Sequence, residues 1–148
     1  MSINPGQIKA LKECMVIIRE DIRGNGAAFF EKMFATYPAW QEKFPAWKGN
    51  SLEQVKSSVR IRAHGTSVFS ELGKFVDSMD DMDVLKDLLK RSGMFHTGKG
   101  IGIEYFQKVG DLLVSFLKER LGGKFTGDME GAWRAVWPII VEGLKAGM

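Results

Sequence analysis

The chain has 148 residues, a length that allows one hydrophobic core and little more. Hydrophobic residues make up 45% of it, including 10 Phe, 8 Met and 4 Trp, and this composition is typical of a globular protein with a bulky interior. The 21 basic and 18 acidic residues are dispersed along the chain and leave a formal net charge of +3, which argues against a nucleic-acid-binding patch.

The sequence also indicates where the protein works. No apolar run approaches the roughly 18 residues of a membrane span, and the N-terminal MSINPGQIKA lacks a secretory pattern. The single cysteine, Cys14, cannot form an intrachain disulfide and is expected to be a small buried apolar residue. We therefore expect a single domain over residues 1–148, located in the cytoplasm and not associated with a membrane.

The first predicted helix begins at Asn4 and Pro5. Asn4 can act as the N-cap, and Pro5 suits the first helical position because the N–H that it lacks would be unpaired there. Gly24–Gly26 is predicted to break this helix. Apolar residues recur between these limits at helical spacing, at Ile8, Leu11, Met15, Ile18 and Ile22.

The second predicted helix ends before Pro38, because proline disfavours the helical conformation of the preceding residue. A short helical turn over residues 40–44 follows, and a corner at 49–51 leads to Ser51 and Gln54, which can form a capping box. The residues that the second helix is predicted to bury are Phe30, Met33, Phe34 and Tyr37.

Four further segments complete the helical pattern. One helix extends to about Val76, and the acidic stretch 77–83 is a solvated loop that leads into the next helix. Gly122 ends a third helix, and Pro138 is predicted to kink the last one. The chain shows no strand-like alternation of useful length, so the expected fold class is all-α. The apolar faces are Ile61, Gly65, Val68, Leu72 and Phe75; Val84, Leu85, Leu88, Leu89, Ser92 and His96; Phe106, Val109, Leu113, Phe116 and Leu117; and Trp133, Val136, Trp137, Ile140 and Leu144.

Two glycines on different predicted helices, Gly26 and Gly65, suggest a close helix crossing. A glycine inside a helix costs about 0.5–1 kcal/mol relative to alanine, so Gly65 should have a structural reason. Gly26 could equally mark only the start of a helix.

The chain has only two histidines, and each lies on an apolar helical face. His64 lies in RIRAHGTSVFSEL, and His96 closes DVLKDLLKRSGMFH before a glycine-rich turn; Phe44 precedes His64 by 20 residues. One histidine of this kind is usually a hydrogen-bonded core residue. Two of them, with an aromatic residue upstream, favour a haem pocket, because a neutral imidazole is a good axial ligand for iron.

Taken in order over residues 4–147, these features resemble the globin family, which includes the haemoglobins and myoglobins. The GNG-x-x-F start of the second helix and the WKGNSL corner resemble intracellular globins of molluscs and annelids. The resemblance implies a globin fold of about seven to eight helices around a haem pocket. The residues that carry it are Tyr37, Pro38, Phe44, His64, Gly65, Val68, His96, Ile101, Ile103, Phe106 and Trp133.

The resemblance also implies roles for these residues. His96 is the expected proximal iron ligand, and Ser92, one turn earlier, is a candidate partner for its other ring nitrogen. His64 is expected on the distal side, where its N–H would donate a hydrogen bond to bound O2. The haem is expected to be haem b, bound noncovalently, because the chain has no C-x-x-C-H motif. The other expected haem contacts are Phe30, Phe44, Val68, Leu88, Leu89, Lys99, Ile101 and Phe106.

Each of these other residues has an ordinary alternative. Taken singly, the apolar ones would be core residues in any helical protein. Lys99 could pair with a haem propionate or be a solvated surface lysine.

The implied function is reversible binding of O2 for storage or transport, without an enzymatic role; CO and NO are the other expected ligands. Three alternatives remain: a redox-active globin with peroxidase, nitrite or nitric-oxide dioxygenase chemistry, a sensor or electron-transfer globin in which His64 itself binds iron, and a haem-free partner-binding module. No further acid–base group is expected near His64, so enzyme chemistry would be a side activity.

Two assembly states are compatible with the sequence, a monomer and a homo-oligomer. In an oligomer the two histidine-bearing helices would pair, and Met79, Met82 and Met94 would add adaptable contact surface.

Overall fold

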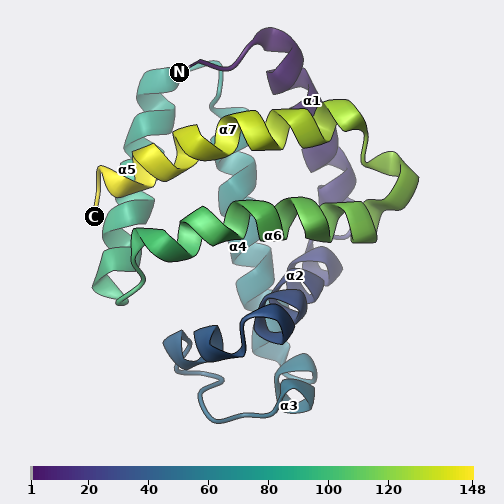
Figure 1. Ribbon diagram of the computed structural model, residues 1–148, viewed down its shortest axis with the longest axis vertical. Coiled ribbons are helices and arrows are strands. Elements are labelled where there is room, and N and C mark those ends of the chain that lie inside the picture. The colour runs from purple at the N-terminus through teal and green to yellow at the C-terminus, as the bar shows by residue number, and fades with distance from the viewer. Residues whose placement is uncertain (1) are drawn as a thin grey trace. The chain divides into compact units, whose positions relative to one another are not determined.

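The computed structural model describes residues 2–148, which form seven α-helices and two 3-10 helices and contain no β-strand. The all-α class predicted from the sequence is confirmed. Figure 1 shows the elements, which in chain order are α1 (Pro5–Arg19), α2 (Ile22–Thr36), η1 (Pro38–Lys43), α3 (Leu52–Lys56), α4 (Val59–Asp77), α5 (Met82–Gly98), α6 (Ile103–Leu121), η2 (Gly122–Lys124) and α7 (Gly127–Lys145).

The chain folds into two compact units. One is Ile17–Leu72, called here the 17–72 unit. The other, the C-terminal unit, combines the residues up to Val16 with Gly73–Met148. No helix within residues 2–148 is both long and apolar enough to cross a membrane.

Local capping explains several helix ends. Asn4 and Gln7 bond reciprocally through backbone amides and side-chain oxygens at the start of α1. Ser51 and Gln54 form the predicted capping box at the start of α3. Both features were readable from sequence because all the partners lie within one helical turn.

The predicted break at Gly24–Gly26 is wrong. The chain leaves helical structure at Glu20 and Asp21, and both glycines lie inside α2. Asp21 is the N-cap and accepts a hydrogen bond from the Gly24 amide at 3.1 Å. A side chain on Gly24 would collide with that carboxylate, so this glycine serves the cap instead of ending a helix.

The predicted crossing of α2 and α4 at Gly26 and Gly65 is confirmed within the 17–72 unit. A Cβ atom on either glycine would overlap the backbone of the other. Beside the crossing, the Phe29 and Phe69 rings meet edge to face with centroids 5.6 Å apart. The two helices therefore pack backbone to backbone, which only glycine allows.

In the C-terminal unit, α7 packs against both α5 and α6 (Figure 1). Gly122 ends α6 with a φ of 56°, and α7 returns alongside α6 in the opposite direction. Against α5, Gly93 lies close to the Leu144 carbonyl, and Gly143 lies close to the Leu89 side chain. Pro138 lies inside α7, which continues as a helix on both sides of it.

Most residues of the predicted apolar faces are buried or half-buried, but the predictions for Val84 and Met79 are wrong. Val84 is 46% exposed, although it was predicted to share the buried side of its helix. Met79 is only 2% exposed, so it cannot line an exposed surface for a second copy, whereas Met94 is 59% exposed. Val84 lies in the first turn of α5, where periodicity gives a weak signal, and Met79 lies in the turn between α4 and α5, outside any helical pattern.

Cys14 is a buried residue, as predicted. Its side chain is fully buried, and its sulfur accepts a hydrogen bond from Nε1 of Trp133 at 3.4 Å. Burial raises the pKa of the thiol, and the hydrogen bond from Trp133 acts in the opposite direction. The residue is therefore a neutral part of the α1–α7 packing.

Candidate haem site

His96 lies in the last turn of α5, and its orientation is set by a local hydrogen bond. Its Nδ1 atom is 2.7 Å from the carbonyl oxygen of Ser92, and 3.4 Å from the Ser92 hydroxyl. A carbonyl can only accept, so Nδ1 carries the proton in this contact, and the neutral tautomer that fits it keeps its lone pair on Nε2. The sequence predicted this partner residue, and the structure assigns the contact mainly to its backbone.

The end of α5 fixes the chain just after His96. The amides of Lys99 and Ile101 both donate to the His96 carbonyl at 3.0 Å. Gly100 has a φ of 74°, a left-handed conformation that favours glycine, and it turns the chain toward α6. Gly98 belongs to the glycine-rich stretch that was expected to form a turn after His96, but it is the last residue of α5.

Aromatic rings contact the His96 imidazole edge to face. The Phe106 centroid lies 4.8 Å away with an interplanar angle of 82°, and the Phe95 centroid lies 5.3 Å away. Leu88 and Ile101 are half-buried in the same unit. Neutral imidazole with apolar neighbours is suited to ligate a metal inside a hydrophobic cofactor.

Two other predicted haem contacts in the C-terminal unit have partners of their own. Leu89 is 1% exposed and packs against Gly143 of α7. Lys99 is exposed, and its Nζ lies 5.6 Å from the centre of the Phe95 ring, a cation–π distance.

The 17–72 unit places His64 among aromatic side chains. Its imidazole lies 4.7 Å from the Phe30 ring and 5.4 Å from the Phe44 ring, centroid to centroid. Trp47 is third, at 5.8 Å, and is only 2% exposed. Val68 is half-buried in α4, one turn after His64 and therefore on the same side of the helix.

Sequence reasoning missed two residues here, Trp47 and Gln41. Gln41 donates from Nε2 to the carbonyls of Trp47 and Asn50, both at 2.7 Å. These bonds satisfy carbonyls in the irregular corner after η1, and so hold Phe44 and Trp47 against His64. Trp47 could have been predicted, because it is a second large aromatic residue three positions after Phe44. Gln41 could not, because its two hydrogen bonds depend on how the chain folds in the corner after η1.

The donor set of the chain fits iron in a porphyrin. Within residues 2–148, no group of three or more His, Cys, Asp or Glu side chains comes together as a metal site. A haem iron takes four ligands from its own ring nitrogens, so the protein must supply only one imidazole. His96 offers Nε2 for that position, beside apolar residues suited to a porphyrin.

A family model of globins matches residues 27–144 of the chain. The chain belongs to the globin family. Globins bind haem and diatomic gases such as O2.

This globin is similar to globins of molluscs, in agreement with the resemblance to mollusc and annelid globins noted in its sequence. It is 40% identical to Globin-1 of Liolophura japonica, a match that covers 98% of this chain and 99% of that protein. It is 33% identical to a globin of Tritia mutabilis, over 92% and 95% of the two chains. The fold matches that of ferric Aplysia limacina myoglobin with a TM-score of 0.89 and 21% identity, over 99% of both chains. The predicted globin fold is confirmed.

Proposed function

We propose that this globin binds O2 reversibly, for storage or transport in the cytoplasm, at a noncovalent haem b whose axial ligand is His96. The observation that supports this assignment best is the 2.7 Å contact between His96 Nδ1 and the Ser92 carbonyl, because it favours the tautomer whose Nε2 can ligate a metal. A haem held there would supply the iron that binds O2, CO or NO. Family membership implies that His64 would serve the gas-binding side of this haem.

The protein residues have two tasks in this proposal. The Ser92 carbonyl and the Phe106 ring orient the His96 imidazole, and apolar side chains exclude water, which slows oxidation of ferrous iron. Lys99 would pair with a haem propionate. The proposed haem contacts are those predicted from the sequence: Phe30, Phe44, His64, Val68, Leu88, Leu89, Ser92, His96, Lys99, Ile101 and Phe106.

In this proposal, His64 would donate a hydrogen bond to bound O2. The rings of Phe30, Phe44 and Trp47 restrict its side-chain rotation, so little conformational freedom is lost when the bond forms. A hydrogen bond to an acceptor with negative charge contributes about 1.5–3 kcal/mol, which is about 10- to 100-fold in affinity. Phe30 and Phe44 have no hydrogen-bond donor, and the indole N–H of Trp47 bonds to the Ser58 hydroxyl at 3.4 Å, so His64 is the proposed donor of this aromatic group.

The assignment of His96 is tested by His96→Gly. We expect the variant to lose haem, and to recover it when imidazole is added, because imidazole replaces only the missing ligand. Ser92→Ala is the matched comparison: it removes the hydroxyl at 3.4 Å but keeps the carbonyl at 2.7 Å, so His96 should stay oriented and haem loss should be far smaller than in His96→Gly. Unchanged haem affinity in His96→Gly would overturn the proposal.

The assignment of His64 is tested by His64→Leu. Release of O2 should become about tenfold faster or more, whereas CO affinity should be unchanged or higher, because bound CO is less polar. If the variant instead converts a six-coordinate ferrous spectrum to a five-coordinate one, His64 is an iron ligand. If neither change is observed, His64 is only a packing residue.

A further inference from the structure

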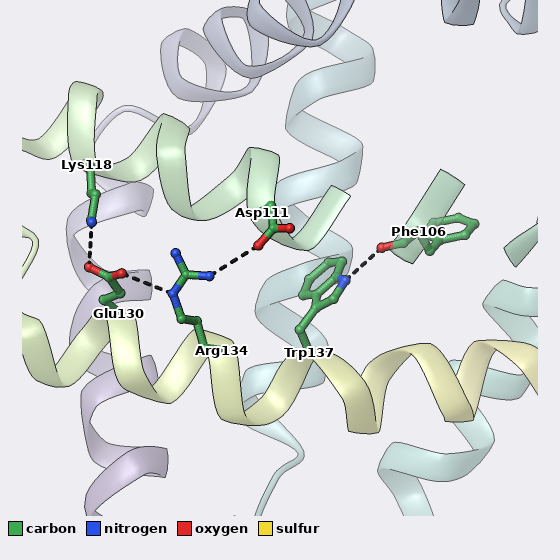
Figure 2. A network of polar contacts seen from close by, with 6 residues as sticks. All are labelled: Phe106, Asp111, Lys118, Glu130, Arg134 and Trp137. Atoms are coloured by element: carbon green, nitrogen blue, oxygen red, sulfur yellow. Dashed lines mark hydrogen bonds and ion pairs between the residues drawn. The ribbon is translucent and has the colours of Figure 1, made fainter. Parts of the chain in front are cut away.

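α7 contacts both helices that carry the proximal residues of the C-terminal unit. Close to its C-terminus it packs on α5, where Gly93 approaches the Leu144 carbonyl. Nearer its middle it meets α6 through polar contacts, which Figure 2 shows. Trp137 lies at one end of this set of contacts, and it is not among the proposed haem contacts.

Trp137 bonds to the first turn of α6. Its Nε1 donates to the carbonyl of Phe106 at 2.8 Å, across 31 residues of sequence, in a part-buried position (Figure 2). Gly110, one turn further along α6, makes room for the indole, because a Cβ atom there would overlap its ring. The indole therefore lies directly on the α6 backbone.

No side-chain cap holds the first turn of α6. Its N-cap is Gly102, which makes no side-chain hydrogen bond to that turn, so contacts with other helices are left to position it. The other contacts between α6 and α7 in Figure 2 are salt bridges of Arg134 with Asp111 and of Lys118 with Glu130, and most of these side chains are exposed. Exposed pairs contribute little, so among these polar contacts the part-buried hydrogen bond of Trp137 should contribute most.

We propose that Trp137 is a positioning residue for the proximal histidine: it holds the first turn of α6 so that the Phe106 ring stays edge to face against His96. The hydrogen bond to the Ser92 carbonyl fixes Nδ1, but it leaves the imidazole free to rock about that bond. The Phe106 ring, 4.8 Å from the imidazole centroid at 82°, opposes this rocking. The inference rests on the proposed ligation of haem iron by His96.

The test uses Trp137→Phe, which keeps an aromatic ring but removes the N–H donor. The protein is loaded with haem b, and two spectroscopic signals are recorded: the iron–histidine stretching band of the ferrous form and the NMR resonance of the His96 Nδ1 proton in the CO form. We expect the band to shift and broaden and the proton resonance to move. Gly110→Ala, which displaces the indole, should produce the same changes.

Trp133→Phe is the matched control. It removes an indole N–H from the same helix, but that group bonds to Cys14 and not to α6. We expect it to lower stability while both His96 signals stay at their wild-type positions. Phe106→Leu keeps the carbonyl but removes the ring, so the double variant with Trp137→Phe should shift the band no further than Phe106→Leu alone.

Wild-type signals in both folded Trp137→Phe and folded Gly110→Ala would overturn the inference, as would an equal change in Trp133→Phe. If His96→Gly keeps the wild-type iron–histidine band, His96 does not ligate the iron and the proposed function itself fails. The two failures are therefore distinguishable.

Discussion

The crossing of α2 and α4 makes a quantitative prediction about Gly65→Ala. In an ordinary helix interior this change stabilises, because alanine has the higher helix propensity by about 0.5–1 kcal/mol. Here the added methyl group would overlap the backbone of Gly26. Forcing extra volume into a packed site costs about 1–3 kcal/mol, and backbone atoms yield less than a flexible side chain.

The steric cost should therefore win. We expect Gly65→Ala to lower the free energy of unfolding by a net amount of about 1–2 kcal/mol. For a domain of this size, that corresponds to a fall in Tm of roughly 3–8 °C. The measurement is urea unfolding followed by circular dichroism, at fixed haem loading because bound haem adds stability of its own.

Gly131→Ala is the matched control. Gly131 lies inside α7, where an added methyl group would meet no other segment of residues 2–148. The same substitution there should stabilise by about 0.5–1 kcal/mol. Opposite signs at the two positions would confirm that the crossing, and not glycine as such, decides the outcome. If Gly65→Ala stabilises as much as Gly131→Ala, the two helices do not pack backbone to backbone and the reasoning is refuted.

Three further outcomes follow from local contacts. A hydrogen bond from Lys118, and to a smaller extent one from Arg134, lowers the pKa of the Glu130 carboxyl. These contacts therefore stabilise the fold at pH values above the carboxyl pKa of the unfolded chain, and the stabilisation is lost as the pH falls through the lower pKa of the folded protein. Glu130→Gln should therefore shift the urea midpoint at neutral pH but not in strong acid; an equal shift at both pH values would contradict this. Ser51→Ala removes the side-chain acceptor of the capping box and should cost about 0.5–2 kcal/mol, measured by the same unfolding curve, whereas an unchanged midpoint would deny the cap a role. The fully buried Cys14 thiol should react with a thiol reagent only as the protein unfolds, and rapid labelling of the native protein would contradict its burial.

Sequence reasoning succeeded where partners lie close together in the chain. The capping box of Ser51 and Gln54 and the contact of His96 with Ser92 each span one helical turn. Helical geometry alone brings such residues together, so their spacing is sufficient to predict the contact. The same holds for the apolar faces of the longer helices, which follow a regular period.

Prediction from the sequence failed where the role of a residue depends on a distant partner or on an unusual local contact. Gly24 and Gly26 looked like a break because glycine is a weak helix former, but one accommodates the Asp21 cap and the other the backbone of Gly65. Met79 lies in an acidic stretch that looked solvated, and only the packing around it makes it buried. Helical periodicity signals neither outcome.

The sequence by itself determined the all-α class, most helix ends, the globin resemblance and the two histidines that could serve a haem. Periodicity, caps and breakers act over a few residues, so they can be read in order along the chain. Only the tertiary structure decided that Gln41 holds the corner beside His64, and that Trp137 bonds to the Phe106 carbonyl next to His96. These contacts join segments whose meeting depends on how helices pack, and packing is fixed by the combined shape of many side chains, which no single stretch of sequence specifies.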